Sequence, residues 1–257
     1  MVLMMFQSFY NDPRSYMFNH IELIVLGIVT MIYIILTTIV AIKFLSKYFE
    51  LKNKVFIYGG IAYFGVASCW FGVGLNFMLV MFFNVIPPME LHFLLHGAIV
   101  TYPQWCWFLL ISYIFHIRHN IRKVLVIFTG ILATIVEILY IYIVFTNVGM
   151  LGHLVEPIQV VYGPFSYIYL SIHLLIFVAQ GLLLGVNSTK SEDKRVRLKG
   201  KFLLASFLFF LGGSLLEVFF TQISIFIVAR IIIAASAVFF YFGFILPKRI
   251  EKIFLKT

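Results

Sequence analysis

The sequence carries very little charge for its length. Charged residues make up 11% of the 257 residues, whereas hydrophobic residues make up 63%. Soluble globular domains have roughly 25% charged and 45–50% apolar residues, and no polar stretch here is long enough to build such a domain outside a membrane. The shortage of charge therefore excludes an ordinary soluble fold and predicts a core that is buried mainly in a lipid bilayer.

Cysteines and processing signals are also scarce. The two cysteines, Cys69 and Cys106, both lie in apolar runs, which argues against the loop-stapling disulfides of small secreted domains. The first twenty residues lack the basic start and the small-residue cleavage site of a removable signal peptide, so we expect the first span to direct insertion. Without an internal repeat or a low-complexity linker, residues 1–257 are expected to form one domain.

Long apolar runs, in contrast, are abundant. A helix that spans a bilayer needs about 20 mostly apolar residues. Runs of this kind lie near residues 21–45, 55–83, 91–115, 124–146, 164–186, 202–221 and 224–246. The break between the last two, "TQIS", is the shortest, and merging them would leave six spans. The predicted fold class is all-α, a polytopic seven-helix transmembrane bundle.

The basic residues favour one side of this bundle. Of the 19 lysines and arginines, only Arg14 belongs to the opposite set of breaks, and only Lys43 and Arg230 lie within spans. Because cytoplasmic loops are rich in Lys and Arg, this distribution predicts an outer N-terminus and an inner C-terminus. Topology thus accounts for the net charge of +9 without nucleic-acid binding. Segment 187–201 is expected to meet anionic lipid heads or a cytoplasmic partner, and segment 247–257 is a second candidate surface for that partner.

Ionisable residues at membrane depth are rare and mark candidate sites. Glu217 lies about four residues from the outer end of the sixth span, and Arg230 about six residues into the seventh. At 1.5 Å per residue both are roughly 6–9 Å below the outer rim. Since a short turn joins these antiparallel helices, we predict an ion pair between Glu217 and Arg230. A structural clamp between the two helices remains an equal alternative to a binding role.

Other polar residues gather at a similar depth. Tracing each span from its outer end gives Glu22, Asn76, Glu90, His92, His96, Glu137 and His173. Almost none of these groups lies in the inner half, which predicts a polar cavity open to the outside and closed below by aromatic and aliphatic layers. We take His96, Glu137, His173, Glu217 and Arg230 as the candidate ligand-binding residues.

A metal site is a weaker alternative. The stretch "ELHFLLHG" (90–97) places His92 and His96 at i and i+4, the spacing that lets two imidazoles reach one metal ion. A third ligand would have to come from another helix, and no second histidine motif is present. The sequence contains no nucleophile motif and implies no cofactor, so we expect a protein that is not an enzyme, with an intramembrane metal-dependent enzyme as the third alternative.

Several seven-helix families can be compared motif by motif. The Pro103–Gln104 pair resembles the proline motif of the PQ-loop and sugar-efflux transporters. Those families carry the motif in the first span of each of two three-helix repeats, whereas here the single pair lies in the third span and the fifth span has none. Residues 224–246 contain no lysine for a retinal Schiff base. The third span lacks the acidic-arginine-aromatic triplet of animal receptors, and the seventh span lacks their Asn-Pro-x-x-Tyr pattern.

The closing stretch "VFFYFGFILPKRIEKIF" (238–254) has a different resemblance. It is similar to the exit of the seven-transmembrane sensor regions that precede histidine kinase and diguanylate cyclase domains, and to uncharacterised archaeal-like seven-helix proteins. The resemblance in span number and orientation covers the whole chain. It implies a receptor-like sensor in the cell membrane that binds a small molecule or lipid from the outside. Because no kinase or cyclase follows within these 257 residues, a separate cytoplasmic partner is expected to read the signal. A small-solute or proton-coupled transporter is the alternative.

Overall fold

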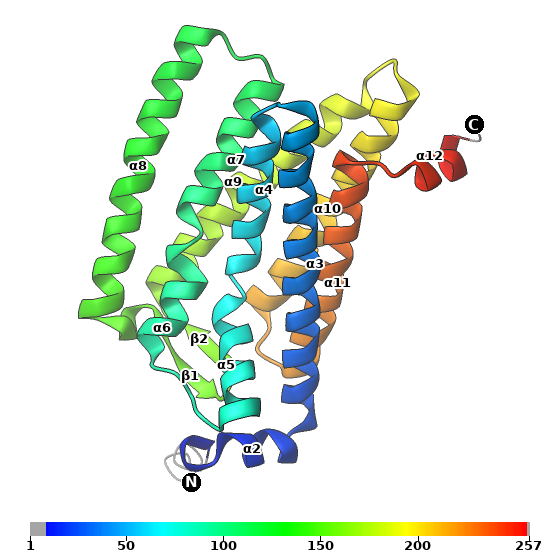
Figure 1. The fold of residues 1–257 in the computed structure, drawn as a ribbon. Coiled ribbons are helices and arrows are strands. Elements are labelled where there is room, and N and C mark those ends of the chain that lie inside the picture. Colours follow the sequence, from blue (N-terminus) through cyan, green and yellow to red (C-terminus); the bar gives the residue numbers. More distant parts are fainter. Residues whose placement is uncertain (1–8, 256–257) are drawn as a thin grey trace.

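The computed structural model describes residues 9–255, and these form an elongated helical bundle (Figure 1). The long helices are α3 (Ile21–Leu51), α8 (His119–Thr146), α9 (Pro164–Thr189), α10 (Lys194–Phe219) and α11 (Ile223–Phe244). The shorter elements are α2 (Pro13–Asn19), α4 (Val55–Ser68), α5 (Phe71–Phe83), α6 (Met89–Phe93), α7 (Thr101–Ile114), α12 (Lys248–Leu255), β1 (Gly152–Glu156) and β2 (Gln159–Tyr162). Helices dominate because they satisfy every backbone hydrogen bond within the segment, as lipid requires.

Each predicted apolar run corresponds to a helix or to a broken helix. Six helices are long and apolar enough to cross a membrane, and the count rises to seven if the bent pair α4 and α5 is one span. Residues 220–222 separate α10 from α11, so the short break predicted there does divide two helices. The all-α helical bundle is therefore confirmed.

Two of the spans are interrupted near their middle. Helices α4 and α5 meet at an angle of 56°, at a break formed by Cys69 and Trp70. The span Met89–Ile114 contains a π-helical turn, Leu94–Ala98, between α6 and α7. Close packing holds the interruptions together: a Cβ added to Gly65 would lie 2.0 Å from the Cβ of Pro103. Interruptions of this kind free backbone groups at membrane depth.

The two ends of the bundle differ (Figure 1). One end, which we call the basic end, gathers the α3–α4, α7–α8 and α9–α10 connections together with α12. The other, the hairpin end, gathers α2, the α10–α11 turn and the antiparallel hairpin of β1 and β2. The sequence reading missed the hairpin, α2 and α12, because each is shorter than a spanning helix.

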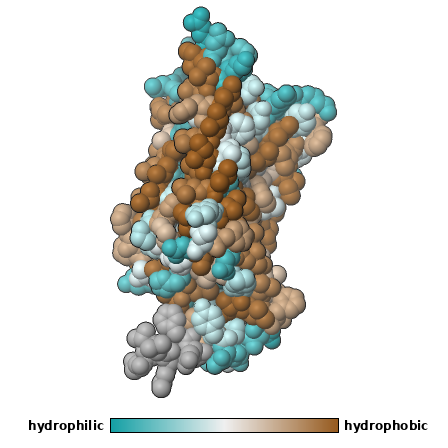
Figure 2. Space-filling view, turned by 90° about the vertical axis from the view of Figure 1, so that its left-hand side faces the viewer, coloured by the Kyte–Doolittle hydropathy of each residue, from teal (hydrophilic) through white to brown (hydrophobic). Residues whose placement is uncertain are grey.

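Between these ends the surface suits lipid. On the face seen in Figure 2, hydrophobic residues cover most of the length between hydrophilic patches at the two ends. Helix α8 stands at the edge, and only 11% of its most apolar window is buried, compared with 33–50% in the other single-helix spans. Inside the basic half, Trp107, Phe207 and Phe240 form part of one aromatic core. This core fills the interior of the bundle toward the basic end.

Candidate functional site

The predicted ion pair between α10 and α11 is present. The Arg230 guanidinium donates from Nε to the Glu217 carboxylate, and the two side chains are 5% and 18% exposed. Helical geometry explains the meeting: both residues lie near the hairpin-end turn that joins the antiparallel helices. A charge pair this deeply buried is stable only when its remaining hydrogen-bonding groups are also satisfied.

Two further side chains satisfy the pair. The Trp70 indole Nε1 donates to Oε2 of Glu217 at 3.1 Å, and Arg230 Nη1 donates to Thr30 Oγ1 at 3.3 Å. The guanidinium carbon also lies 5.3 Å from the centroid of the Trp70 ring, a distance typical of a cation–π contact. One cluster thus joins α3, α10, α11 and the break between α4 and α5.

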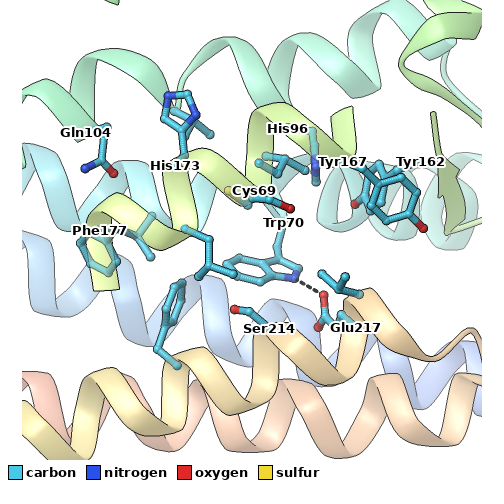
Figure 3. A pocket seen from close by; sticks show the side chains of 17 residues that line it. Cys69, Trp70, His96, Gln104, Tyr162, Tyr167, His173, Phe177, Ser214 and Glu217 are labelled. Atoms are coloured by element: carbon cyan, nitrogen blue, oxygen red, sulfur yellow. Dashed lines mark hydrogen bonds between the residues drawn. The ribbon is translucent and has the colours of Figure 1, made fainter. Parts of the chain in front are cut away.

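A cavity of about 120 Å³ lies against this cluster (Figure 3). Its lining comes from both interrupted spans, from α9 and α10, and from strand β2. Most of the lining is apolar, and the polar members are His96, Gln104, Ser171, His173, Ser214 and Glu217, with the hydroxyls of Tyr162 and Tyr167. The Trp70 indole lies among them with its nitrogen turned to Glu217 (Figure 3).

Several buried polar atoms of the lining have no hydrogen-bond partner among residues 9–255. They are both ring nitrogens of His96, the Gln104 amide nitrogen and the Ser214 hydroxyl. Leaving such a group unsatisfied costs about 1–3 kcal/mol, so native proteins rarely keep several around one space without a role. The cavity therefore offers donors and acceptors to a molecule that enters it.

The π-helical turn places His96 on the cavity wall. Gly97 has room for no side chain, because a Cβ there would lie 2.0 Å from the Tyr140 hydroxyl. The tyrosine hydroxyls bond to the turn: Tyr140 donates to the carbonyl of Phe93 at 3.2 Å, and Tyr169 donates to that of Gly97 at 2.9 Å. Helices α8 and α9 thereby stabilise a turn that an isolated chain would not keep.

The hairpin supplies part of the same wall. Tyr162 of β2 stacks on His96 with ring centroids 4.9 Å apart. The hairpin is attached to α5 by the Pro157 carbonyl, which accepts from Asn76 at 3.3 Å, and to the α10–α11 turn by Gln159, which donates to the Thr221 carbonyl at 3.0 Å. The hairpin thus caps the cavity at this end of the bundle.

His173 lines the cavity from α9, and its Nδ1 lies 2.8 Å from the Tyr169 carbonyl one turn earlier. Glu137 is buried in α8, 6% exposed, and lies close enough to Thr101 and Tyr169 to interact with them electrostatically. Its Oε2 has no hydrogen-bond partner in the described part of the chain, and it does not line the cavity. Arg230 lies behind Glu217 and Trp70 and does not line it either.

The histidine pair does not extend to a metal-binding group. The rings of His92 and His96 are stacked with centroids 5.8 Å apart, and His92 Nδ1 lies 3.3 Å from the Asn76 side-chain oxygen. Within residues 9–255, no cluster of three or more His, Cys, Asp or Glu side chains has the proximity to hold a metal ion. The spacing alone was a weak signal, because the third ligand depends on tertiary contacts.

Outside the spans, Glu156 of β1 lies near three other titratable side chains, Tyr16, His20 and Glu22. Burial raises the pKa of its carboxyl above the ordinary value, His20 opposes the rise, Glu22 adds to it, and a hydrogen bond with Tyr16 opposes it. We therefore expect the stability of the hairpin end to depend on the protonation of this side chain.

Of the five predicted binding residues, the structure brings His96, His173 and Glu217 to one cavity and places Arg230 directly behind it. Trp70 and Tyr162 also line the cavity, and they were not predicted from the sequence. A tryptophan between "SC" and "FG" in the middle of a span was the available signal for Trp70. Tyr162 gave none, because the hairpin that carries it was not expected.

Comparisons with protein-family models, with curated proteins and with solved structures find no match to this chain. The fold and the cavity therefore carry the functional argument alone.

Proposed function

We propose that this chain is a receptor-like protein of the cell membrane, with seven spans, the hairpin end outside and the basic end in the cytoplasm. Its cavity would bind a small, mainly apolar molecule or lipid that carries one polar group. The observation that supports this best is the combination of apolar walls with the unpartnered atoms of His96, Gln104 and Ser214. Ligand sites are typically apolar cavities with a few convergent polar groups.

Glu217 is the proposed link between binding and conformational change. Its carboxylate is shared between Arg230 on α11 and Trp70 at the α4–α5 break, and it also lines the cavity. A ligand group that donates a hydrogen bond to Glu217 competes with these two partners. Such competition would shift the population of arrangements of α10 against α11. Both helices continue to the basic end, where segments 187–201 and 247–257 would present the change to a separate cytoplasmic partner.

A short brominated alcohol is a suitable first probe, because its hydroxyl can donate to Glu217 and bromine quenches the fluorescence of a nearby tryptophan. We expect saturable quenching of the purified protein, and loss of the saturable part in Trp70→Phe and in the cavity-filling Ser214→Leu. The matched control is Gly212→Leu on the same helix, where an added Cβ meets nothing within 4 Å. Saturable quenching that is equal in Ser214→Leu and wild type would reject the cavity as the binding site.

The transporter alternative also has a specific observation in its favour. Discontinuous helices at the membrane midplane form substrate sites in many secondary transporters, and both interrupted spans line this cavity. Flux of the labelled alcohol into sealed proteoliposomes, measured above that into protein-free liposomes, separates the two functions. Binding without flux supports the receptor-like function, and flux that Ser214→Leu abolishes supports the transporter.

A further inference from the structure

A second hollow lies at the basic end, far along α10 from the cavity. It has a volume of about 550 Å³ and is lined by Lys194, Arg197, Leu198, Lys201, Phe202, Ala205, Phe239, Phe254 and Leu255. Its walls come from α10, α11 and α12. We propose that this hollow, the basic groove, binds the phosphate headgroup and the upper acyl chain of an anionic phospholipid.

The charges of the basic groove are arranged on one helix face. Lys194, Arg197 and Lys201 are spaced i, i+3 and i+7 along α10, so they project in the same direction. All three are exposed, and within residues 9–255 none of them has an ion-pair or side-chain hydrogen-bond partner. In the described part of the chain, no acidic side chain lines the groove. Three uncompensated cations favour an anion, and an arginine among them favours phosphate oxygens.

The apolar part of the basic groove continues from the charges toward the middle of the bundle. Leu198, Phe202 and Ala205 follow on α10, and Phe239 faces them from α11, with the Phe202 and Phe239 ring centroids 6.3 Å apart. A free phosphate makes no apolar contact with this wall, whereas the acyl chain of a phospholipid, directly below its headgroup, can pack against it. The order of charge and apolar surface thus matches a phospholipid rather than a soluble anion.

Helix α12 forms the outer wall of the groove. Phe254 of α12 packs on Phe202 with centroids 5.4 Å apart, and Glu251 pairs with Arg195 at 3.2 Å. The helix has no buried residue, and its sequence "KRIEKIFL" alternates cations with large apolar side chains. A helix of this kind lies in the plane of the headgroups. The anionic leaflet that attracts basic segments is the cytoplasmic one, which agrees with the proposed topology.

The test uses the full chain in a neutral detergent with added phosphatidylglycerol or phosphatidylcholine of the same acyl length. The readouts are lipid adducts in native mass spectrometry and the melting temperature. We expect a saturable adduct and a higher melting temperature with phosphatidylglycerol only. The triple variant Lys194→Gln, Arg197→Gln, Lys201→Gln should lose both the adduct and the rise in melting temperature. The reason is that each cation near an anionic lipid surface contributes about fivefold in affinity.

A matched control removes equal charge elsewhere at the same end: Lys54→Gln, Lys123→Gln, Lys190→Gln. These lysines are exposed and do not line the groove. A second variant, Ala205→Phe, leaves the charge unchanged and fills the apolar wall, so it should weaken phosphatidylglycerol binding while the melting temperature without lipid stays close to that of wild type. It keeps the test valid if the triple variant folds poorly.

Equal losses in the triple variant and its charge-matched control would overturn the proposal, because net charge alone would then explain binding. Equal binding of both lipids would overturn it as well. Inorganic phosphate that gives the same thermal shift as phosphatidylglycerol would show a soluble-anion site instead of a lipid site. None of these outcomes depends on the cavity at the hairpin end.

Discussion

The two halves of the bundle each contain an arginine paired with a glutamate, in opposite surroundings. In the hairpin half, Arg230 and Glu217 are buried between helices and are shared with Trp70 and Thr30. At the basic end, Arg195 and Glu251 are 51% and 22% exposed and attach α12 to α10. The same chemistry therefore has a different consequence, because water screens one pair and the protein interior surrounds the other.

The difference extends beyond the two pairs. The hairpin half contains buried polar groups around a cavity, whereas the interior of the basic half is packed with aromatic rings such as Trp107, Phe207 and Phe240. The cations of the basic half lie on its surface instead. The two halves thus differ in where their charges lie: buried between helices in the hairpin half and exposed in the basic half.

The largest effect is expected for Arg230→Ala. It leaves Glu217 buried without its counter-charge, which typically costs about 3–5 kcal/mol, so the melting temperature of the purified protein should fall steeply. The double variant Glu217→Leu, Arg230→Met replaces both charges by apolar groups and should recover much of the loss. A single variant as stable as wild type would mean that the pair is solvated and that the two halves do not differ.

Gly97→Ala should be the next largest. The new methyl would overlap the Tyr140 hydroxyl, at 2.0 Å, and Tyr140 is itself buried. Overpacking of this kind costs about 1–3 kcal/mol, and it should also reduce saturable quenching by the brominated alcohol because His96 lies in the same turn. Gly212→Ala is the matched control and should leave the melting temperature unchanged or higher. Equal behaviour of both alanine variants would show that the π-helical turn adapts freely.

A smaller effect is expected from the protonation of Glu156. Burial raises the pKa of this carboxyl in the folded protein, so the stability linked to its protonated form is full below the unfolded pKa and is lost as the pH rises through the folded pKa. Wild type should therefore gain melting temperature on acidification from neutral pH toward the ordinary pKa of a glutamic acid. Glu156→Gln should lack that part of the gain. Identical pH profiles of the two proteins would contradict the buried position of the carboxyl.

The smallest effect belongs to Arg195→Ala. Exposed ion pairs contribute about 0.2–1 kcal/mol, so the melting temperature should change little at low salt and not at all at high salt. Arg230→Ala measured in the same salt series provides the contrast, because its loss should be nearly independent of salt. A salt-sensitive Arg230→Ala would reverse the assignment of buried and exposed pairs.

Much of the fold was predictable because each apolar run has a length that only a spanning helix uses. The pair of Glu217 and Arg230 was predictable for a related reason: a short turn between antiparallel helices fixes which depths meet. The contributions of Trp70 and Tyr162 to the cavity were not predictable. The break between α4 and α5 brings Trp70 there, and the hairpin between α8 and α9 brings Tyr162. The π-helical turn at Leu94–Ala98 in the third span was not predicted either.

The amino-acid sequence is enough to establish the helical class, the apolar runs, the one-sided distribution of Lys and Arg and the expected depth of the ionisable residues. These properties follow from local composition and from the cost of placing polar groups in lipid. Tertiary contacts, in contrast, bring His96, His173 and Glu217 to one cavity, place Arg230 behind it and leave Glu137 apart from it. The reason is physical: residue spacing fixes depth and face within one helix, whereas contacts between helices depend on how bends, glycines and tyrosine hydrogen bonds pack them together.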